Sequence, residues 1–372
     1  MHGFFSCPQP PDWRIDWSTL DTLPFIREMR GCPQHPVRHA EGDVWTHVHM
    51  VCEAMVAIPA WRELPEDERE LLFTTALLHD VSKPACTRTE SNGEITSRGH
   101  SWKGAIRSRQ ILWRRGVPFL LREQVCAMVR HHLVPFYLVE HANHKRLAIE
   151  VSQTARCDHL SIMAEADARG RTCPDPDRLL DHISFFRLTC EETGVLREPF
   201  PFLNEHARFL YFRDANRQPD SPAHEEFRAN VVLLSGLPGS GKDHWLTMTM
   251  PGEPVISLDA LRHELGVSPS DPQGEVLNKA REMARVHLRA GESFVWNATN
   301  LSRQIRNECI RLFADYNAHI RIVYVEAPVN KLFAQNRMRK RKVPEAVIER
   351  LLDRWEVPDT TEAHRVEFAI GD

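Results

Sequence analysis

Apolar positions in the first half of the chain recur with a helical period. Val44, Val48, Val51 and Met55 lie at i, i+4, i+7 and i+11, which is the spacing of one buried helix face. Four similar stripes follow along the chain: one after Pro65, one from His100, one over residues 117–132 and one that ends near Asp167. Asn92-Gly93 indicates a turn or hairpin between the first two of these stripes. This pattern predicts an all-helical domain over residues 1–171.

The second half alternates short apolar runs with amphipathic segments. The runs typical of strands are Val231–Leu234, Val255–Leu258, Ser293–Trp296, Ile320–Glu326 and Val366–Ile370. The segments typical of helices are Glu275–Ala290, Ser302–Ala318, Asn330–Lys340 and Glu345–Trp355. Such alternation predicts a doubly wound α/β domain over residues 230–372, with a parallel sheet of about five strands. Residues 172–229 are rich in proline and charge, and we interpret them as a connector with short helical segments.

Composition narrows the class of protein. With 372 residues, 42% of them hydrophobic, the chain is long enough for two cores, and its net charge of −4 excludes a strongly basic nucleic-acid coat but not a local basic groove. The nine cysteines are scattered and never form a C-x-x-C pair, which indicates reduced thiols. No apolar run approaches bilayer length and the start lacks a signal peptide pattern, so we expect a cytoplasmic protein without a membrane partner.

One stretch carries the clearest chemistry, and it reads VVLLSGLPGSGK. A strand stops at Gly236, and Gly241-Lys242 follow at the spacing of a phosphate-binding loop. Glycines there let backbone N–H groups surround phosphate oxygens, and the lysine reaches the terminal phosphates. A tight connection without a ligand is the alternative, but strand, spacing and lysine all agree. We therefore expect ATP or another NTP to bind Gly236, Gly239, Ser240, Gly241 and Lys242.

Asp243 stands where a serine or threonine hydroxyl normally touches Mg²⁺. A carboxylate close to phosphates repels them unless a cation lies between the two groups. Asp243 thus indicates a Mg²⁺ contact, either direct or through water.

Polar residues follow the next two strands of the second half. Asp259 and Arg262 lie three apart after the second strand, so on a helix they face the same way. Asp259 could accept the proton of an attacking hydroxyl while Arg262 grips an anionic group of the acceptor, although a capping aspartate with a salt bridge has the same pattern. Asn297 and Asn300 follow the third strand and suit phosphate or metal-water contacts, or a purely local turn.

A basic run precedes Pro344 and contains Arg337, Arg339, Lys340, Arg341 and Lys342. Such runs are usually solvated faces. Here the run lies between two helical segments, which favours a lid whose arginines close on the transferring phosphoryl group. We expect Arg337 or Arg339 to fill that role.

Histidines and aspartates fall at the ends of the helices predicted in the first half. The seven groups are His47, His79, Asp80, His100, His131, His132 and Asp167. Each histidine alone is more often a satisfied core or surface group, but seven such groups at the ends of different helices indicate a metal site. Imidazole and carboxylate together suit Mn²⁺, Fe²⁺, Ni²⁺, Co²⁺ or Zn²⁺, and seven ligands are enough for two ions.

The order of these groups resembles the HD phosphohydrolase superfamily, an all-helical metal-dependent fold. The stretches that carry the resemblance are GDVWTH, LLHDVSK, GHSWKGA and ADARGR. The resemblance implies one metal on His47, His79, Asp80 and Asp167. It also implies a second metal, bridged by Asp80, on His100, His131 and His132, with Lys83 facing the scissile phosphate and with phosphoester hydrolysis as the reaction.

The second half resembles the P-loop 5′-hydroxyl polynucleotide kinases. The resemblance rests on GLPGSGKD, LDALR, NATNLSR and NRMRKRKVP. It implies that Lys242 binds NTP phosphates, that Asp259 is the general base and that Arg262 engages the acceptor's phosphate. Asp243 and Asn297 depart from the family pattern, which leaves the details of metal binding open.

Together the two halves resemble the HD-Pnk family of bacterial end-healing enzymes. The resemblance implies removal of 2′,3′-cyclic, 2′- or 3′-phosphates and phosphorylation of a 5′-OH, with RNA or DNA ends as substrates and with coupling to a nucleic acid ligase. Two enzymatic alternatives stay open: a kinase of a nucleoside or antibiotic beside an HD nucleotidase or dNTPase, and an HD enzyme regulated by a P-loop ATP sensor. A nucleotide-gated binding protein with decayed sites is the non-enzymatic alternative.

Overall fold

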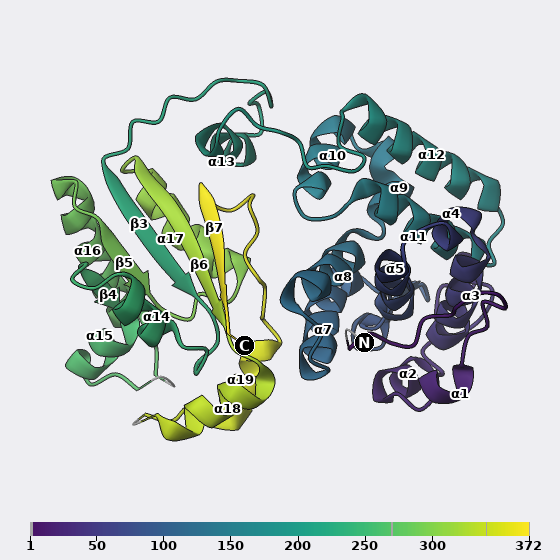
Figure 1. Ribbon diagram of the computed structural model, residues 1–372, viewed down its shortest axis with the longest axis horizontal. Coiled ribbons are helices and arrows are strands. Elements are labelled where there is room, and N and C mark those ends of the chain that lie inside the picture. Colours follow the sequence, from purple (N-terminus) through teal and green to yellow (C-terminus); the bar gives the residue numbers. More distant parts are fainter. Residues whose placement is uncertain (1–2, 269–270, 340, 372) are drawn as a thin grey trace. The chain divides into compact units, whose positions relative to one another are not determined.

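The first half of the chain folds as a helical unit. The computed structural model describes residues 3–268, 271–339 and 341–371, and it divides into two compact units, Met1–Phe200 and Pro201–Asp372 (Figure 1). The helices of the first unit are α1 (Trp17–Leu20), α2 (Pro24–Met29), α3 (Val44–Ala57), α4 (Pro59–Arg62), α5 (Glu66–Leu78), α6 (Lys83–Cys86), α7 (His100–Arg114), α8 (Phe119–His131), α9 (Val134–Tyr137), the 3₁₀ turn η1 (Leu138–Glu140), α10 (His144–Ser152), α11 (Cys157–Arg169) and α12 (Pro176–Glu192).

The core of this unit forms where α3, α5, α8 and α11 pack on one another. Val48, Val51 and Met55 of α3 are fully buried, as their spacing predicts. A small antiparallel hairpin, β1 (Arg88–Thr89) and β2 (Ile95–Thr96), interrupts the helices and turns at the predicted Asn92-Gly93 step. The prediction of a helical N-terminal domain is confirmed.

The segment interpreted as a connector contributes a helix to each unit. Helix α12 packs on α9, α10 and α11 of the first unit. Helix α13 (Glu205–Arg213) belongs to the second unit, where Phe209 joins the core beside Ala229 and Ile320. The two units divide at residues 200 and 201, inside the expected connector.

The second unit is built on a five-stranded parallel sheet. Its strands run in the order β4-β5-β3-β6-β7, and neighbouring strands pair in parallel. The strands and helices are β3 (Ala229–Ser235), α14 (Lys242–Thr249), β4 (Val255–Ser257), α15 (Leu258–Leu265), α16 (Gly274–Ala290), β5 (Phe294–Asn297), α17 (Arg303–Ala314), β6 (Ala318–Glu326), α18 (Val329–Met338), α19 (Glu345–Leu352) and β7 (Arg365–Ile370). The predicted α/β fold is confirmed.

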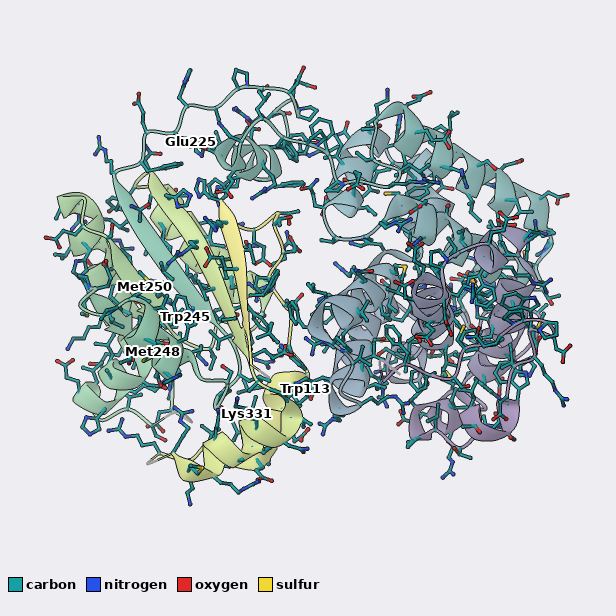
Figure 2. All side chains as sticks on the ribbon, in the orientation of Figure 1. Trp113, Glu225, Trp245, Met248, Met250 and Lys331 are labelled. Carbon is teal, nitrogen blue, oxygen red and sulfur yellow. The ribbon has the colours of Figure 1, made fainter. Side chains whose placement is uncertain are left out.

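Alternate residues of β3 serve two different cores. Val231 and Leu233 join a large core with α15, α16 and α17, whereas Val232 and Leu234 face a smaller one that Trp245 of α14 covers. Met248 of α14 points away and is 69% exposed (Figure 2). Because the strands are parallel, their carboxyl ends meet at one edge, where β3, β4 and β5 deliver the phosphate-binding loop, Asp259 and Asn297.

The helix predicted to reach residue 318 ends earlier in the structure. The helix expected over residues 302–318 is α17, which ends at Ala314. Asn317 has a φ of 55°, a left-handed conformation that stops a helix, and β6 starts one residue later.

A buried imidazole makes the stability of the second unit depend on pH. His364 is 1% exposed, and burial together with the nearby His319, His206 and Arg208 lowers its pKa to about 3 from 6.5. Its Nδ1 accepts the N–H of Ile320 at 3.0 Å, a bond that protonation of Nδ1 removes. Between those two pKa values the unfolded chain binds a proton at this site and the folded chain does not.

We therefore expect the free energy of unfolding of this unit to fall as the pH drops below about 6.5, with His364 contributing up to about 1.4 kcal/mol per pH unit. Denaturant unfolding at several pH values measures the slope. His364→Gln, which lacks the titrating ring, should flatten it. An unchanged slope in the variant would assign the pH dependence to other groups.

Candidate active sites

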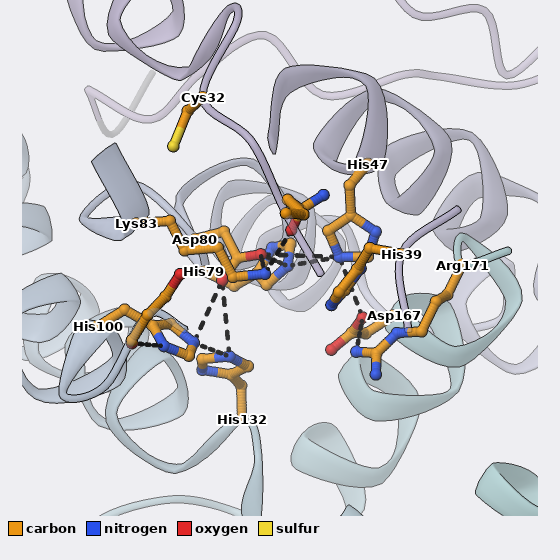
Figure 3. A network of polar contacts seen from close by, with 12 residues as sticks. Cys32, His39, His47, His79, Asp80, Lys83, His100, His132, Asp167 and Arg171 are labelled. Carbon is orange, nitrogen blue, oxygen red and sulfur yellow. Dashed lines mark hydrogen bonds and ion pairs between the residues drawn. The ribbon is translucent and has the colours of Figure 1, made fainter. Parts of the chain in front are cut away.

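Four histidine side chains converge inside the first unit (Figure 3). His47 lies in the first turn of α3 and His100 begins α7, whereas His79 and His132 follow the last residues of α5 and α8. The Nε2 atoms of His47 and His79 are 3.4 Å apart, and so are those of His100 and His132. Four helix ends thus bring four ring nitrogens to one point.

The opposite nitrogen of each ring is fixed by an acceptor. Nδ1 of His79, His100 and His132 donates to the carbonyl oxygens of Ala76, Ser97 and Val129 at 2.8, 2.7 and 2.8 Å. Nδ1 of His47 lies 2.9 Å from a carboxylate oxygen of Glu41 and 3.2 Å from the carbonyl oxygen of Gly170. With the proton held on Nδ1, each Nε2 presents its lone pair to the centre, which is the arrangement of metal-ligating histidines.

Asp80 lies between the two histidine pairs. Its Oδ2 is 3.3 Å from Nε2 of His79 and 3.7 Å from Nε2 of His47. Its Oδ1 is 3.4 Å from Nε2 of His100 and 3.9 Å from Nε2 of His132. Asp167 adds a second carboxylate on the side of His47, where its Oδ1 lies 3.2 Å from Nε2. One aspartate therefore faces both pairs, one oxygen to each.

These residues fit two divalent cations. The sets His47–His79–Asp80 and Asp80–His100–His132 each have ligand atoms within 4.8 Å of one another. No donor among the residues that the structure describes bonds the buried Oδ1 of Asp80, a costly state that a bound cation removes. Burial and the neighbouring His100 and His79 lower the pKa of His132 to about 3, so its ring is neutral and free to act as a ligand.

The structure brings six of the seven expected ligands together, and His131 is not one of them. As the last residue of α8, its side chain points about 100° around the helix axis from that of the next residue, His132. Nε2 of His131 lies 3.2 Å from Oγ1 of Thr154 instead. A sequence stripe could not separate two adjacent histidines at a helix end, but their directions differ.

Two positively charged side chains, Lys83 and Arg171, flank the carboxylates of Asp80 and Asp167. Nζ of Lys83 lies 2.6 Å from Oδ2 of Asp80 and 2.7 Å from Oε1 of Gln34. Nη2 of Arg171 lies 2.7 Å from Oδ1 of Asp167, one helical turn earlier. Both cations line a cavity of about 460 Å³ that also contacts Asp80 and Asp167. Lys83 was expected there. Arg171 was not assigned a role, although its spacing of four from Asp167 is a readable signal.

Sequence reasoning missed the loop before α3. Glu41 accepts hydrogen bonds from Nδ1 of His47 and Nδ1 of His39, each at 2.9 Å. Burial disfavours the Glu41 carboxylate, but these two donors outweigh it and lower its pKa. The loop has no periodicity, so nothing in the sequence pairs Glu41 with His47. Its carboxylate fixes the orientation of a ligand from behind.

We expect Glu41→Gln to weaken divalent cation binding by about ten- to a hundredfold, because an amide holds the His47 ring less firmly. Isothermal titration with Mn²⁺ measures the change. The control is Glu53→Gln on α3, which removes an exposed carboxylate that accepts a hydrogen bond from Trp17. Equal affinities of the two variants would show that Glu41 does not orient the ligand.

The phosphate-binding loop of the second unit has the conformation that its glycines predict. Gly236, Gly239 and Gly241 have φ angles of 147°, 84° and 100°. A Cβ atom on Gly236 would lie 2.3 Å from the carbonyl oxygen of Val325, so no side chain fits there. Ser240 has a buried Oγ without a hydrogen-bond partner in the described structure.

Lys242 closes over this loop. Its Nζ donates to the carbonyl oxygens of Gly236 and Leu237 at 2.7 and 2.9 Å. Burial, assisted by the charge of Arg339, lowers its pKa to about 8, while Asp243 and Asp259 oppose the shift. Nucleotide phosphates, which are anionic, would raise this pKa again.

Asp259 and two arginines meet at the end of β4. Nη1 of Arg262 forms an ion pair with Oδ1 of Asp259, and Nε of Arg262 donates to Gln273 at 2.7 Å. Nη2 of Arg339, which follows α18, lies 3.9 Å from Oδ2 of Asp259. Arg337 instead faces Glu345 at 3.4 Å and is mostly exposed. Of the two expected lid arginines, the structure brings Arg339 to Asp259, and Lys340 lies outside the described residues.

The two expected asparagines, Asn297 at the end of β5 and Asn300 three residues later, have different roles. Nδ2 of Asn297 donates to Oδ1 of Asp243 at 2.9 Å, so the two departures from the kinase pattern contact each other. Nδ2 of Asn300 donates to the carbonyl oxygen of Leu234 at 2.6 Å, and this side chain is buried. Asn300 braces β3 below the phosphate-binding loop and does not present its amide to a ligand.

Comparisons with known proteins agree with the two units. A family model described as an HD domain matches residues 44–169, and one described as an AAA domain matches residues 231–358. A curated relative, the Multifunctional CCA protein of Halorhodospira halophila, is 32% identical over 111 residues. That match covers 30% of this chain and 24% of the relative, so the chain spans about a quarter of the relative's length.

Solved structures resemble the second unit more distantly. A candidate kinase from Chloroflexus aurantiacus has a TM-score of 0.32 at 15% identity, with 39% of this chain and 86% of that chain covered. A sugar kinase from Janibacter has a TM-score of 0.30 at 17% identity, with 38% and 85% covered.

The chain therefore joins an HD phosphohydrolase domain to a P-loop kinase-like domain. A hydrolase and a phosphotransferase are the enzyme classes that these two domains define, the first with divalent metal and the second with a nucleotide and Mg²⁺. Among the described residues, none of the helices has the length and apolarity that crossing a membrane requires.

Proposed function

We propose that this protein heals broken nucleic-acid ends. The first unit hydrolyses 2′,3′-cyclic, 2′- or 3′-phosphates, and the second transfers the γ-phosphate of an NTP to a 5′-OH polynucleotide end. Breakage that leaves a 5′-OH and a terminal phosphate requires both corrections before a ligase can seal the strands, which gives a reason for one chain to carry both domains.

The observation that supports this proposal most is the open setting of Asp259. Its side chain is 71% exposed even with Arg262 and Arg339 beside it. A base that serves a small acceptor normally lies in an enclosed pocket, whereas an exposed base admits the end of a long chain. Arg262 then holds a phosphate of the acceptor while Asp259 takes the proton of its 5′-hydroxyl.

Within the kinase domain the remaining groups act on the donor. Lys242 leaves the carbonyl oxygens of Gly236 and Leu237 and binds the terminal phosphates, which the backbone N–H groups of the loop surround. Arg339 neutralises charge on the transferring phosphoryl group. Asp243, which accepts a hydrogen bond from Asn297, would position Mg²⁺ or its water.

In the HD domain, six side chains would hold the cations, namely His47, His79, Asp80, His100, His132 and Asp167. Bound divalent cations would supply Lewis acid chemistry that polarises the phosphate and activates water. Lys83 and Arg171 orient the anionic ester in the cavity through their N–H groups.

One assay tests both reactions. The protein is mixed with an oligonucleotide that has a 5′-OH and a 3′-phosphate, together with ATP, Mg²⁺ and Mn²⁺, and both ends are resolved on a gel. We expect a 5′-phosphate to appear and the 3′-phosphate to disappear. An untouched 5′ end together with ATP consumption on free nucleosides would contradict the proposal.

A further inference from the structure

The cavity at the HD site is larger than the reacting phosphate needs. Its volume of about 460 Å³ is within the range of pockets that bind whole small molecules. Besides Asp80, His100, His132 and Asp167, the residues of two loops line this cavity. Neither loop carries any of the six side chains that would hold the cations. The first loop, residues 31–43, precedes α3, and the second, residues 87–99, contains the β1–β2 hairpin.

The first loop is held in place at several points. Its ends meet where the N–H of Gly31 donates to Oδ2 of Asp43 at 2.6 Å, and its middle is tied where Ala40 donates to the carbonyl oxygen of Thr172 at 2.9 Å. Nδ1 of His35 accepts the backbone N–H of Arg38 at 3.3 Å. The backbone that carries Arg38 is therefore fixed beside the cavity.

The second loop is tied to the first and to the metal ligands. Oγ1 of Thr87 contacts Oγ of Ser97 at 2.8 Å and Sγ of Cys32 in the first loop at 3.6 Å. The carbonyl oxygen of Ser97 accepts Nδ1 of His100 at 2.7 Å. In the sequence, Arg98 thus lies between Ser97, whose carbonyl oxygen orients an imidazole ring, and His100, the candidate cation ligand that carries this ring.

Arg38 and Arg98 differ from the other cations of the cavity. Lys83 and Arg171 are each paired with a carboxylate, Asp80 and Asp167 respectively. Within the described residues, neither Arg38 nor Arg98 has a carboxylate within ion-pair distance of its guanidinium, and both are exposed at the cavity. Glu94 is the one carboxylate on these loops that also lines the cavity. The rim therefore holds two positive charges that the protein itself does not neutralise.

We propose that Arg38 and Arg98 form a subsite for the internucleotide phosphate next to the terminal phosphate ester. This inference rests on the proposed function and extends it: the HD domain prefers polynucleotide ends to mononucleotides. Guanidinium groups donate paired hydrogen bonds to phosphate oxygens, and two of them on separate loops can hold one backbone phosphate between them. The terminal phosphate then lies at Lys83, Arg171 and the residues that hold the divalent cations.

Binding without metal provides the first test. A six-nucleotide RNA carries a dye at its 5′ end, which blocks the kinase site, and a 3′-phosphate; its fluorescence anisotropy is titrated with the full-length protein in EDTA. We expect Arg38→Gln and Arg98→Gln each to weaken binding about tenfold and to lower the salt dependence of log Kd by roughly 0.7. Arg88→Gln is the control, because Arg88 lies on the same hairpin outside the cavity and, among the described residues, its guanidinium donates one hydrogen bond, to the carbonyl oxygen of Thr87.

Kinetics on two substrates provide the second test. The six-nucleotide RNA with a 2′,3′-cyclic phosphate is compared with a 2′,3′-cyclic mononucleotide, both with Mn²⁺. We expect the wild-type KM to be at least about tenfold lower for the RNA than for the mononucleotide. Arg38→Gln and Arg98→Gln should each raise the KM of the RNA about tenfold without changing kcat. The KM of the mononucleotide should stay the same in all variants. Glu94→Gln, which removes the repelling carboxylate, should lower the KM of the RNA.

The outcomes separate this inference from the proposed function. Equal wild-type KM values for RNA and mononucleotide would overturn the subsite and leave the end-healing reaction standing. Equal losses on both substrates in Arg38→Gln or Arg98→Gln would also overturn it, because the arginines would then act at the reacting phosphate or on the fold. Hydrolysis of bis(p-nitrophenyl) phosphate but of neither nucleotide substrate would overturn the proposed function, and the subsite with it.

Discussion

Asp80→Asn should abolish phosphoester hydrolysis while 5′ phosphorylation continues. The two oxygens of Asp80 face different histidine pairs, so the change removes a charge from both cation sites at once. We expect a loss on the order of 10³-fold in the rate of 3′-phosphate release. The asparagine has nearly the same shape, so the surrounding packing can remain.

The kinase reaction of the same preparation is the control for folding. His131→Asn is the matched variant, because His131 is adjacent to a ligand in sequence but contacts Thr154. That variant should keep cation affinity and hydrolysis within about threefold of wild type. Substantial hydrolysis in Asp80→Asn, or a loss in His131→Asn as large as in Asp80→Asn, would contradict the six-residue ligand set.

Lys242→Ala should have the reverse effect. Lys242 is the cation that the phosphate-binding loop holds at its own carbonyl oxygens, ready for nucleotide phosphates. Its removal should reduce 5′ phosphorylation on the order of 10³-fold and leave 3′-phosphate release unchanged. Radiolabelled ATP and a 5′-OH oligonucleotide measure the first activity, and a 3′-labelled substrate measures the second.

Two neighbouring arginines sharpen this prediction. Arg339→Ala should lower phosphorylation strongly, because Arg339 lies beside Asp259, whereas Arg337→Ala should have little effect, because Arg337 pairs with Glu345 at the surface. The reverse order would show that the helices around this segment rearrange when nucleotide binds. Loss of both activities from Lys242→Ala in a folded protein would contradict the independence of the two domains.

The fold follows largely from local patterns. Helical stripes in the first half and strand-helix alternation in the second are consequences of burial with periods of 3.6 and 2, and both were readable from single segments. The phosphate-binding loop is also local, because Gly236, Gly241 and Lys242 act within one turn. The error in the end of α17 has a local cause as well, because Asn317 ends this helix through a backbone conformation that composition does not predict.

The candidate sites were readable only in part. Seven cation ligands were expected from their places at helix ends, and the structure gathers six of them, because His131 and His132 could not be told apart until the end of α8 set their directions. Asn300 was expected to face a ligand and instead bonds the backbone of β3. Glu41, Arg38 and Arg98 lie on irregular loops, where no period connects a residue with its neighbours in space.

The sequence by itself determined the two kinds of domain, the phosphate-binding loop and most of the residues able to hold cations, because those features depend on residue types at fixed short spacings. Tertiary structure alone decided which nitrogen of each histidine faces the centre, which arginine meets Asp259 and which charges remain unpaired at the cavity. These properties depend on contacts between segments far apart in the chain, such as Glu41 with His47 and Arg339 with Asp259. The packing of whole elements sets those contacts, and a local pattern carries no information about it.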